Sequence, residues 1–219
     1  MPNVRINGAE VVVIGVLKGL VKEEEKVAKA VADYRPDVIG ISTSKEELDA
    51  LRAKETHSDY ELSALEQVYQ VYMEHFGEVR LPTPAYLKAI ELADEAHLPL
   101  IPIDMNDEEF TDQYCKRIRG VDMVRESFYT RSIKRRKYRI GSAEEFALDW
   151  DRKVNRAKGF RQLEHDREEH MALTLRNMSK KHERILVFVE YERAAGVEGY
   201  LRPKDGALSP SNGPLRCLV

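Results

Sequence analysis

The chain has 219 residues, of which 42% are hydrophobic and 33% are charged, and its formal net charge is −3. This balance is typical of a folded globular protein and argues against a disordered chain, a membrane-spanning chain and a general nucleic-acid binder. Residues 1–10 lack the basic and apolar regions of a signal peptide, and Cys115 and Cys217 lack metal-site spacing. We therefore expect a cytoplasmic protein with no membrane span.

The first part of the chain predicts a strand, a helix and a second strand. Residues 11–17 are continuously apolar, which is typical of a strand that is covered on both faces. Glutamates at 23–25 suit the first turn of the following helix, because carboxylates there meet the positive end of the helix dipole. Pro36 ends this helix, and "DVIGIS" at 37–42 supplies the second strand. A unit of this length is most simply a right-handed crossover in a parallel sheet.

The rest of the chain continues the alternation of helices and strands. A helix after Thr83 and Pro84 leads into a third strand at 100–103, and a long helix leads into a fourth strand within "RILVFVEYE". The long helix is expected at 161–182. Further helices are expected at 45–54 and 60–76, with a charged, largely helical region at 106–158.

These elements predict one α/β domain over residues 1–202. Its central sheet should be mostly parallel, contain at least four strands and be flanked by helices. Residues 203–219 are rich in proline, glycine and serine, and we expect them to form a tail that is mobile or lies along the surface.

Polar residues follow each of the four predicted strands. In open α/β sheets, ligands bind beyond the carboxyl ends of the strands, so parallel strands would bring these residues to one edge. They are Lys18, Ser42, Thr43, Ser44, Asp104, Asn106, Glu190, Glu192 and Arg193. Such a cluster could bind an anionic ligand. The alternative is that strand ends are polar only because the chain returns to water there.

One charged residue lies within the apolar stripe of the long helix. Arg167 falls in the middle of the stripe that is formed by Leu163, Met171, Thr174 and Met178. A buried guanidinium requires a partner, so we expect Arg167 to reach a carboxylate such as Asp104 or Glu190, or a ligand. The alternative is that its stem lies on apolar surface while the guanidinium group reaches solvent.

Four stretches between residues 11 and 201 resemble the TraB/PrgY (pheromone-shutdown) family, part of the Tiki/TraB-like group of proposed metal-dependent hydrolases. They are "VVVIGVLKG", "VAKAVADYRPDVIGIS", "AYLKAIELADEAHLPLIPID" and "DREEHMALTLRNMSKKHERILVFVEYERAAGVEGYL". The first is similar to a strand that ends in Gly-Thr-Ala-His in the family, and the last to a Glu-Arg-Asp-x-x-Met-Ala helix followed by a strand and Gly-Ala-Gly-His. The resemblance implies an α/β fold with a strand-end site.

The residues at the family's chemical positions differ from its pattern. Lys18 and Arg193 stand where the family has its two histidines, and Ser42 stands where it has a glutamate. Of the Asp-Arg-Asp turn only Asp104 remains, whereas Arg167 is retained on the helix. A protonated lysine has no lone pair for a metal, so we expect neither a metal nor another cofactor, and an anion is the more natural occupant.

The sequence leaves three functions open. In the first, the chain is a non-catalytic binding or regulatory module with a cationic strand-end pocket. The residues that would hold a small anionic ligand are Lys18, Ser42, Asp104, Arg167, Glu190 and Arg193. In the second, the chain is a metal-independent, hydrolase-like enzyme in which Lys18 acts as base or nucleophile, with Asp104 and Arg167 as further catalytic candidates.

The third function uses the basic segment at residues 125–139. This segment interleaves basic residues with aromatic ones, which is typical of a surface for nucleic acid or for an acidic protein. The residues of this predicted patch are Arg131, Lys134, Arg135, Arg136, Lys137 and Arg139. The alternative is a solvated loop that pairs with the nearby acids of "SAEEF" and "DWDRK". The sequence is also compatible with a homo-oligomer.

Overall fold

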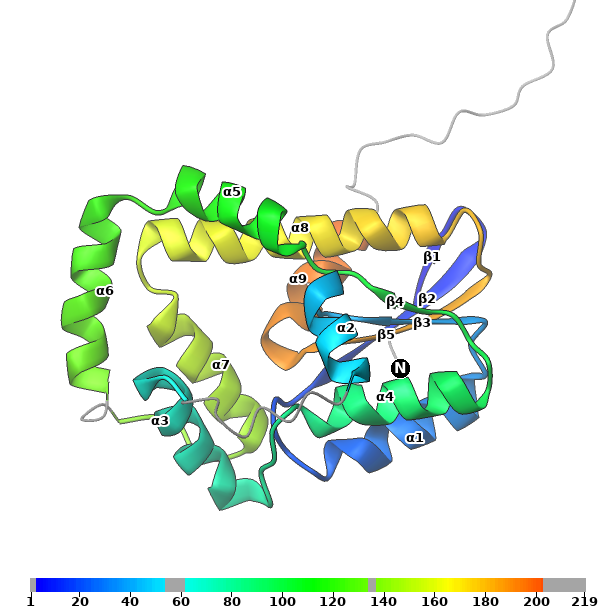
Figure 1. The fold of residues 1–219 in the computed structure, drawn as a ribbon, viewed down its shortest axis with the longest axis horizontal. Helices are drawn as coiled ribbons and strands as arrows, with labels where there is room; N and C mark the ends of the chain where they lie inside the picture. Colours follow the sequence, from blue (N-terminus) through cyan, green and yellow to red (C-terminus); the bar gives the residue numbers. More distant parts are fainter. Residues whose placement is uncertain (1–2, 54–61, 134–136, 203–219) are drawn as a thin grey trace, which may run out of the picture.

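The computed structural model describes residues 3–53, 62–133 and 137–202, and its centre is a five-stranded sheet in the order β1-β2-β5-β3-β4 (Figure 1). Strand β1 is antiparallel to β2, and all the other pairs are parallel. The strands are β1 (Asn3–Ile6), β2 (Ala9–Val16), β3 (Val38–Ile41), β4 (Leu100–Pro102) and β5 (Arg184–Glu190). The predicted α/β fold with a mostly parallel sheet is confirmed.

Helices cover both faces of this sheet, and others stand to one side of it (Figure 1). In the described ranges they are α1 (Glu23–Tyr34), α2 (Lys45–Arg52), α3 (Ala64–Met73), the 3-10 turn η1 (Glu74–Phe76), α4 (Pro84–Glu95), α5 (Asp107–Arg117), α6 (Gly120–Ile133), α7 (Ala143–Val154), α8 (Lys158–Met178) and α9 (Tyr191–Leu201). None of these described helices combines the length and the apolar character that crossing a bilayer requires.

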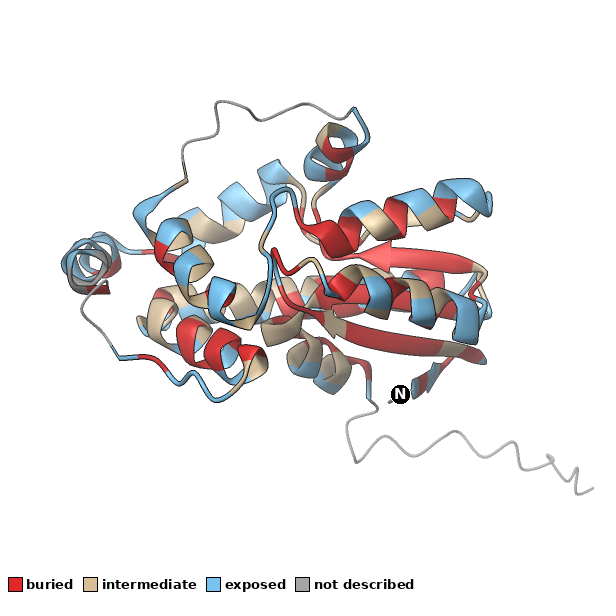
Figure 2. Ribbon diagram, turned by 90° about the horizontal axis from the view of Figure 1, so that it is seen from below, coloured by how far each residue is buried: buried red, intermediate tan, exposed pale blue. Residues whose placement is uncertain are grey.

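The position of β5 in the middle of the sheet explains why its sequence is continuously apolar. Ile185, Val187 and Val189 pack on one face of the sheet against α8 and α9. Leu186 and Phe188 pack on the other face against α1, α2 and α4. Figure 2 shows the buried residues along the strands and on the inward sides of the helices. A strand that is buried on both faces has no position for a polar side chain until it ends.

A third apolar cluster lies beyond the ends of the parallel strands. Leu17 and Leu20, which follow β2, pack there with residues of α3 and α7, including Phe146 and Trp150. This cluster attaches α3 and α7 to the end of the sheet. It therefore forms one side of the space into which the strand ends point.

The sequence analysis did not predict strand β1. It forms a hairpin with β2 through Asn7 and Gly8, whose φ angles are 51° and 89°. Two successive residues with positive φ are typical of the tight turn that Asn-Gly favours between antiparallel strands. Only Val4 and Ile6 of β1 are buried, so its apolar signal is weak.

Several predicted helix limits are wrong by a few residues. The helix predicted at 45–54 ends at Arg52, and the one predicted at 161–182 spans Lys158–Met178. The helix predicted at 60–76 begins at Ala64, because Ser63 and Glu66 form a reciprocal capping box. Thr83 lies at the start of α4, but its side chain makes no capping hydrogen bond within the described structure. The expected tail, 203–219, lies outside the described residues.

Helices α8 and α9 approach each other closely at Gly196. A methyl group at Gly196 would overlap the carboxylate of Glu168, which the Arg193 guanidinium holds at 2.9 Å. A methyl group at Gly199, one turn further along α9, would meet no atom within 4 Å in the described structure. The same substitution in one helix should therefore have opposite effects at these two glycines.

We expect Gly196→Ala to lower the free energy of unfolding by about 1–2 kcal/mol, because overpacking outweighs the better helix propensity of alanine. Gly199→Ala should raise it by up to about 1 kcal/mol. Urea unfolding of both variants, followed by circular dichroism, measures the difference. Equal effects at the two positions would show that the α8–α9 contact does not limit side-chain size.

Candidate functional site

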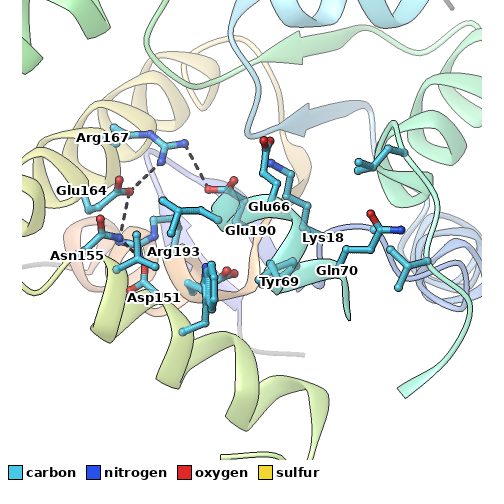
Figure 3. Close-up of a pocket in the computed structure, with 17 residues that line it drawn as sticks. Lys18, Glu66, Tyr69, Gln70, Asp151, Asn155, Glu164, Arg167, Glu190 and Arg193 are labelled. Atoms are coloured by element: carbon cyan, nitrogen blue, oxygen red, sulfur yellow. Dashed lines mark hydrogen bonds and ion pairs between the residues drawn. The ribbon is translucent and has the colours of Figure 1, made fainter. Parts of the chain in front are cut away.

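A pocket opens beyond the carboxyl ends of β2 and β5, between the strand ends and helices α3, α7, α8 and α9 (Figure 3). Its cavity volume is about 260 Å³. Its apolar lining consists of Leu65, Tyr69, Val79, Leu81, Trp150 and Val154. Its charged lining consists of the cations Lys18, Arg167 and Arg193 and the carboxylates Glu66, Asp151, Glu164, Glu190 and Glu192. The pocket is therefore of mixed charge.

Strand pairing explains why residues so distant in sequence share this pocket. Strands β2 and β5 are parallel neighbours, and Val16 lies opposite Glu190 in their register. Lys18 follows Val16 by two residues, and Arg193 lies in the first turn of α9, directly after β5. The predicted convergence of the first and fourth strands is confirmed, and four of the six expected ligand residues line one cavity.

The other two expected residues, Ser42 and Asp104, lie behind this lining and hold the strand ends together. The Ser42 hydroxyl accepts a hydrogen bond from the Glu190 backbone N–H at 3.1 Å and lies 2.7 Å from the Tyr86 hydroxyl. Asp104 accepts one from the Met105 backbone N–H at 2.8 Å. Both side chains thus support the site from the sheet side.

Arg167 binds three carboxylates, including both that the sequence suggested. Figure 3 shows two of them, Glu164 and Glu190. Its Nε lies 3.1 Å from Asp104 Oδ2, one terminal nitrogen lies 2.8 Å from Glu164 Oε2, and the other lies 3.3 Å from Glu190 Oε2. Burial alone would lower the pKa of Arg167, but these carboxylates raise it well above its ordinary value. The guanidinium is a buried, fully ionised cross-link between α8 and two strand ends.

Arg193 forms a second buried cross-link beside the first. One terminal nitrogen lies 2.9 Å from Glu168 Oε1 and 3.6 Å from Glu164 Oε2, and the other pairs with Asp151. Burial raises the pKa of Glu164, whereas the two arginines on either side of it lower it. Two of the three cations expected to face a ligand are therefore held by carboxylates of α7, α8 and the sheet.

Lys18 is the third cation, and its surroundings differ. It is exposed at the mouth of the pocket, and within the described residues its ammonium group has no hydrogen bond or ion pair. Its charge still acts on the pocket, because it helps Arg167 to lower the pKa of Glu190. It also opposes the effect of burial on Glu47, whose pKa is nevertheless raised. Lys18 is thus the pocket cation that is positioned to meet an incoming anion.

Two glutamates at the end of β5 have pKa values that are shifted in opposite directions. Burial acts to raise the pKa of Glu190, but Arg167, with Lys18 and Arg193, outweighs it, so the pKa is lowered. Burial, followed by the negative charge of Glu190, raises the pKa of Glu192 to about 7. The Glu192 Oε2 atom is buried and has no hydrogen-bond partner in the described structure. Environments that separate two carboxyl pKa values in this way are typical of functional sites.

The predicted basic patch lies apart from this pocket. Arg131 is exposed on α6, with its guanidinium 6.0 Å from the centre of the Phe128 ring. Lys137 and Arg139 are exposed, but their backbones bond to α7: the Lys137 carbonyl accepts from Lys153, and the Arg139 N–H donates to Asp149. Asp149 and Lys153 of "DWDRK" thus hold this segment through its backbone. Lys134, Arg135 and Arg136 lie outside the described residues.

Sequence reasoning missed the carboxylates that neutralise the two arginines, chiefly Asp151, Glu164 and Glu168. Glu164 lies three residues before Arg167 on one helix, which is a spacing that indicates a side-chain pair. Asp151 had no such signal, because it reaches Arg193 from a separate helix. Among the residues that the structure describes, no three His, Cys, Asp or Glu side chains are arranged to hold a metal ion.

Comparison of the chain with protein-family models and with curated proteins finds no match.

Proposed function

We propose that this chain is a TraB-like α/β protein that acts as a binding or regulatory module and holds a small anionic ligand in the strand-end pocket. Lys18 makes the ion pair with the ligand. The observation that carries this proposal is the exposed, unpaired ammonium group of Lys18 at the mouth of a partly apolar cavity, within the described residues. The family assignment rests on the four stretches quoted above.

The two arginines have a different role in this proposal. Each is ion-paired with carboxylates, so drawing either toward a ligand would leave a negative charge unpaired in the interior, which costs several kcal/mol. They hold α7 and α8 against the strand ends and so fix the shape of the cavity. Lys18 has no carboxylate partner among the described residues, and its flexible side chain can follow a ligand into the pocket.

The apolar lining specifies the rest of the ligand. Tyr69 and Trp150 contact each other edge to face, with their ring centres 5.7 Å apart, and both line the cavity. A ligand that buries only a charge would leave this surface against water. The pocket therefore suits a small molecule with an anionic group at one end and an apolar body at the other.

Binding is measurable through Trp150, because it is the only tryptophan of the chain. We expect phenylacetate to change its fluorescence saturably, and Lys18→Met to raise the Kd about tenfold, the effect of losing one charge-assisted contact. Lys29→Met, which removes an exposed lysine paired with Asp33 on α1, is the matched control and should leave the Kd unchanged. If neither phenylacetate nor inorganic phosphate binds, or if Lys18→Met binds as the parent chain does, the proposal is wrong.

A further inference from the structure

Like the Tyr69 hydroxyl, Glu192 is a polar group of the pocket with a buried oxygen that has no hydrogen-bond partner among the described residues. It lines the cavity from the first turn of α9, and its Oε2 atom is buried with no hydrogen-bond partner in the described structure. A buried oxygen that lacks a partner is costly, so Glu192 requires a hydrogen-bond partner that the described residues do not supply. Lys18 lines the same small cavity, so one ligand can meet both groups.

The charges that face Glu192 come from every side of the pocket. Glu190 of β5 and Asp151 of α7 oppose its ionisation, Arg193 of α9 favours it, and Tyr69 of α3 faces it as a neutral hydroxyl. Burial is the largest influence, and together these raise the pKa of Glu192 to about 7. Near neutral pH the free pocket therefore holds Glu192 partly as a neutral acid, which can donate a hydrogen bond.

We propose that Glu192 binds the ligand as a neutral carboxylic acid, donating its proton in a hydrogen bond to the anionic group that Lys18 pairs with, so that the pocket selects an apolar monoanion such as a carboxylate. This inference rests on the proposed function. Binding then takes up a proton from solvent whenever Glu192 is ionised in the free protein. Ionised Glu192 would instead repel the anion.

The charge of the lining explains why a monoanion is selected over a dianion. The carboxylates Asp151, Glu164 and Glu190 form ion pairs with the two arginines and neutralise their positive charge. Lys18 alone then remains to balance a ligand, and it balances one negative charge. A dianion such as phosphate would bring a second charge into a cavity that is bordered by carboxylates.

The test compares phenylacetate binding at pH 6 and pH 8 by the fluorescence of Trp150. Phenylacetate is ionised at both values, so a change in Kd reports on the protein. We expect the Kd to be about tenfold higher at pH 8, because a binding-competent protonated group with a pKa near 7 is depleted about tenfold over this range. Phenylacetamide, which has the same shape without the charge, should bind more weakly at pH 6.

Glu192→Gln is the decisive variant, because glutamine donates a hydrogen bond at every pH and has nearly the same shape. Its Kd should be equal at pH 6 and pH 8 and close to that of the parent chain at pH 6. Glu198→Gln, the same change near the C-terminal end of α9 and outside the pocket lining, should keep the tenfold dependence. Circular dichroism establishes that each variant is folded.

The outcomes separate this inference from the proposed function. The role of Glu192 is overturned if phenylacetate binds equally at pH 6 and pH 8 in the parent chain, or if its binding to Glu192→Gln still depends on pH. Either result would still support the ligand site. Preference for phenethylamine over phenylacetate would show that Glu192 binds cations as a carboxylate. Tighter binding of phosphate than of phenylacetate would overturn monoanion selection. If neither anion binds at either pH, the proposed function itself is wrong.

Discussion

Replacing Arg167 with methionine should lower the free energy of unfolding by about 3–5 kcal/mol at pH 7. Methionine retains much of the packing volume of the arginine stem but removes the guanidinium that joins Asp104, Glu164 and Glu190. These carboxylates, which are largely shielded from solvent, then lack their main counter-charge. The expected loss is therefore the cost of isolated buried charge more than the loss of packing.

The effect of Arg167→Met should depend on pH with a definite sign. Arg167 is the main group that lowers the pKa of the buried Glu190, so Glu190 stabilises the folded state above its ordinary pKa and loses this contribution as the pH falls. The variant lacks that contribution at neutral pH. Its deficit should therefore be largest near pH 7 and shrink as the pH falls below about 4.5, where Glu190 is protonated first in the unfolded chain and, at still lower pH, in the folded parent protein.

Urea unfolding of the parent chain and the variant at pH 7 and at pH 4 measures both expectations. Arg161→Met is the matched control, because Arg161 is an exposed arginine on the same helix and its substitution should change stability by less than about 0.5 kcal/mol. A deficit that is equal at the two pH values would show that Glu190 does not depend on Arg167 for its charge.

Glu192→Gln should have the opposite effect and raise the free energy of unfolding by about 2–3 kcal/mol at pH 8. The pKa of Glu192 is raised from 4.5 to about 7, so between these values the folded protein binds more protons than the unfolded chain. Glu192 therefore costs stability progressively as the pH rises from 4.5 to about 7. Glutamine cannot ionise and escapes this cost.

The same variant should unfold with the parent's free energy below about pH 5, where Glu192 is neutral in both states. Urea unfolding at pH 5 and at pH 8 gives the comparison without any ligand. Glu198→Gln, outside the pocket, should change stability little at either pH. A variant that is no more stable than the parent at pH 8 would show that ionised Glu192 is well solvated.

The four parallel strands were predictable because each carries its information in a continuous run of its own residues. The run at 11–17 is buried on both faces, as its unbroken apolar character required. Strand β1 was missed because only two of its residues face the core. Asn7 and Gly8 carried the available signal, since this dipeptide favours a hairpin turn.

The site was predictable only in part. The residues at the strand ends can be read from the sequence, but the carboxylates that pair with them lie on separate helices. Lys18, Glu190 and Arg193 follow strands, so the general rule for parallel sheets brought them together. The neutralisation of Arg193 depends on Asp151, which lies on α7, and no spacing in the sequence connects these two residues. The placing of Glu192 in one cavity with Tyr69 and Trp150 likewise depends on how α3 and α7 dock.

The position of β5 in the sheet has a consequence for biosynthesis. This strand lies between β2 and β3, yet it is the last of the five strands to leave the ribosome. Until it emerges, the strand pairs β1-β2 and β3-β4 each present an open inner edge whose backbone N–H and C=O groups can pair with other chains. These two pairs of strands remain exposed to other molecules until β5 has been synthesised, which makes protection by chaperones most valuable before β5 emerges.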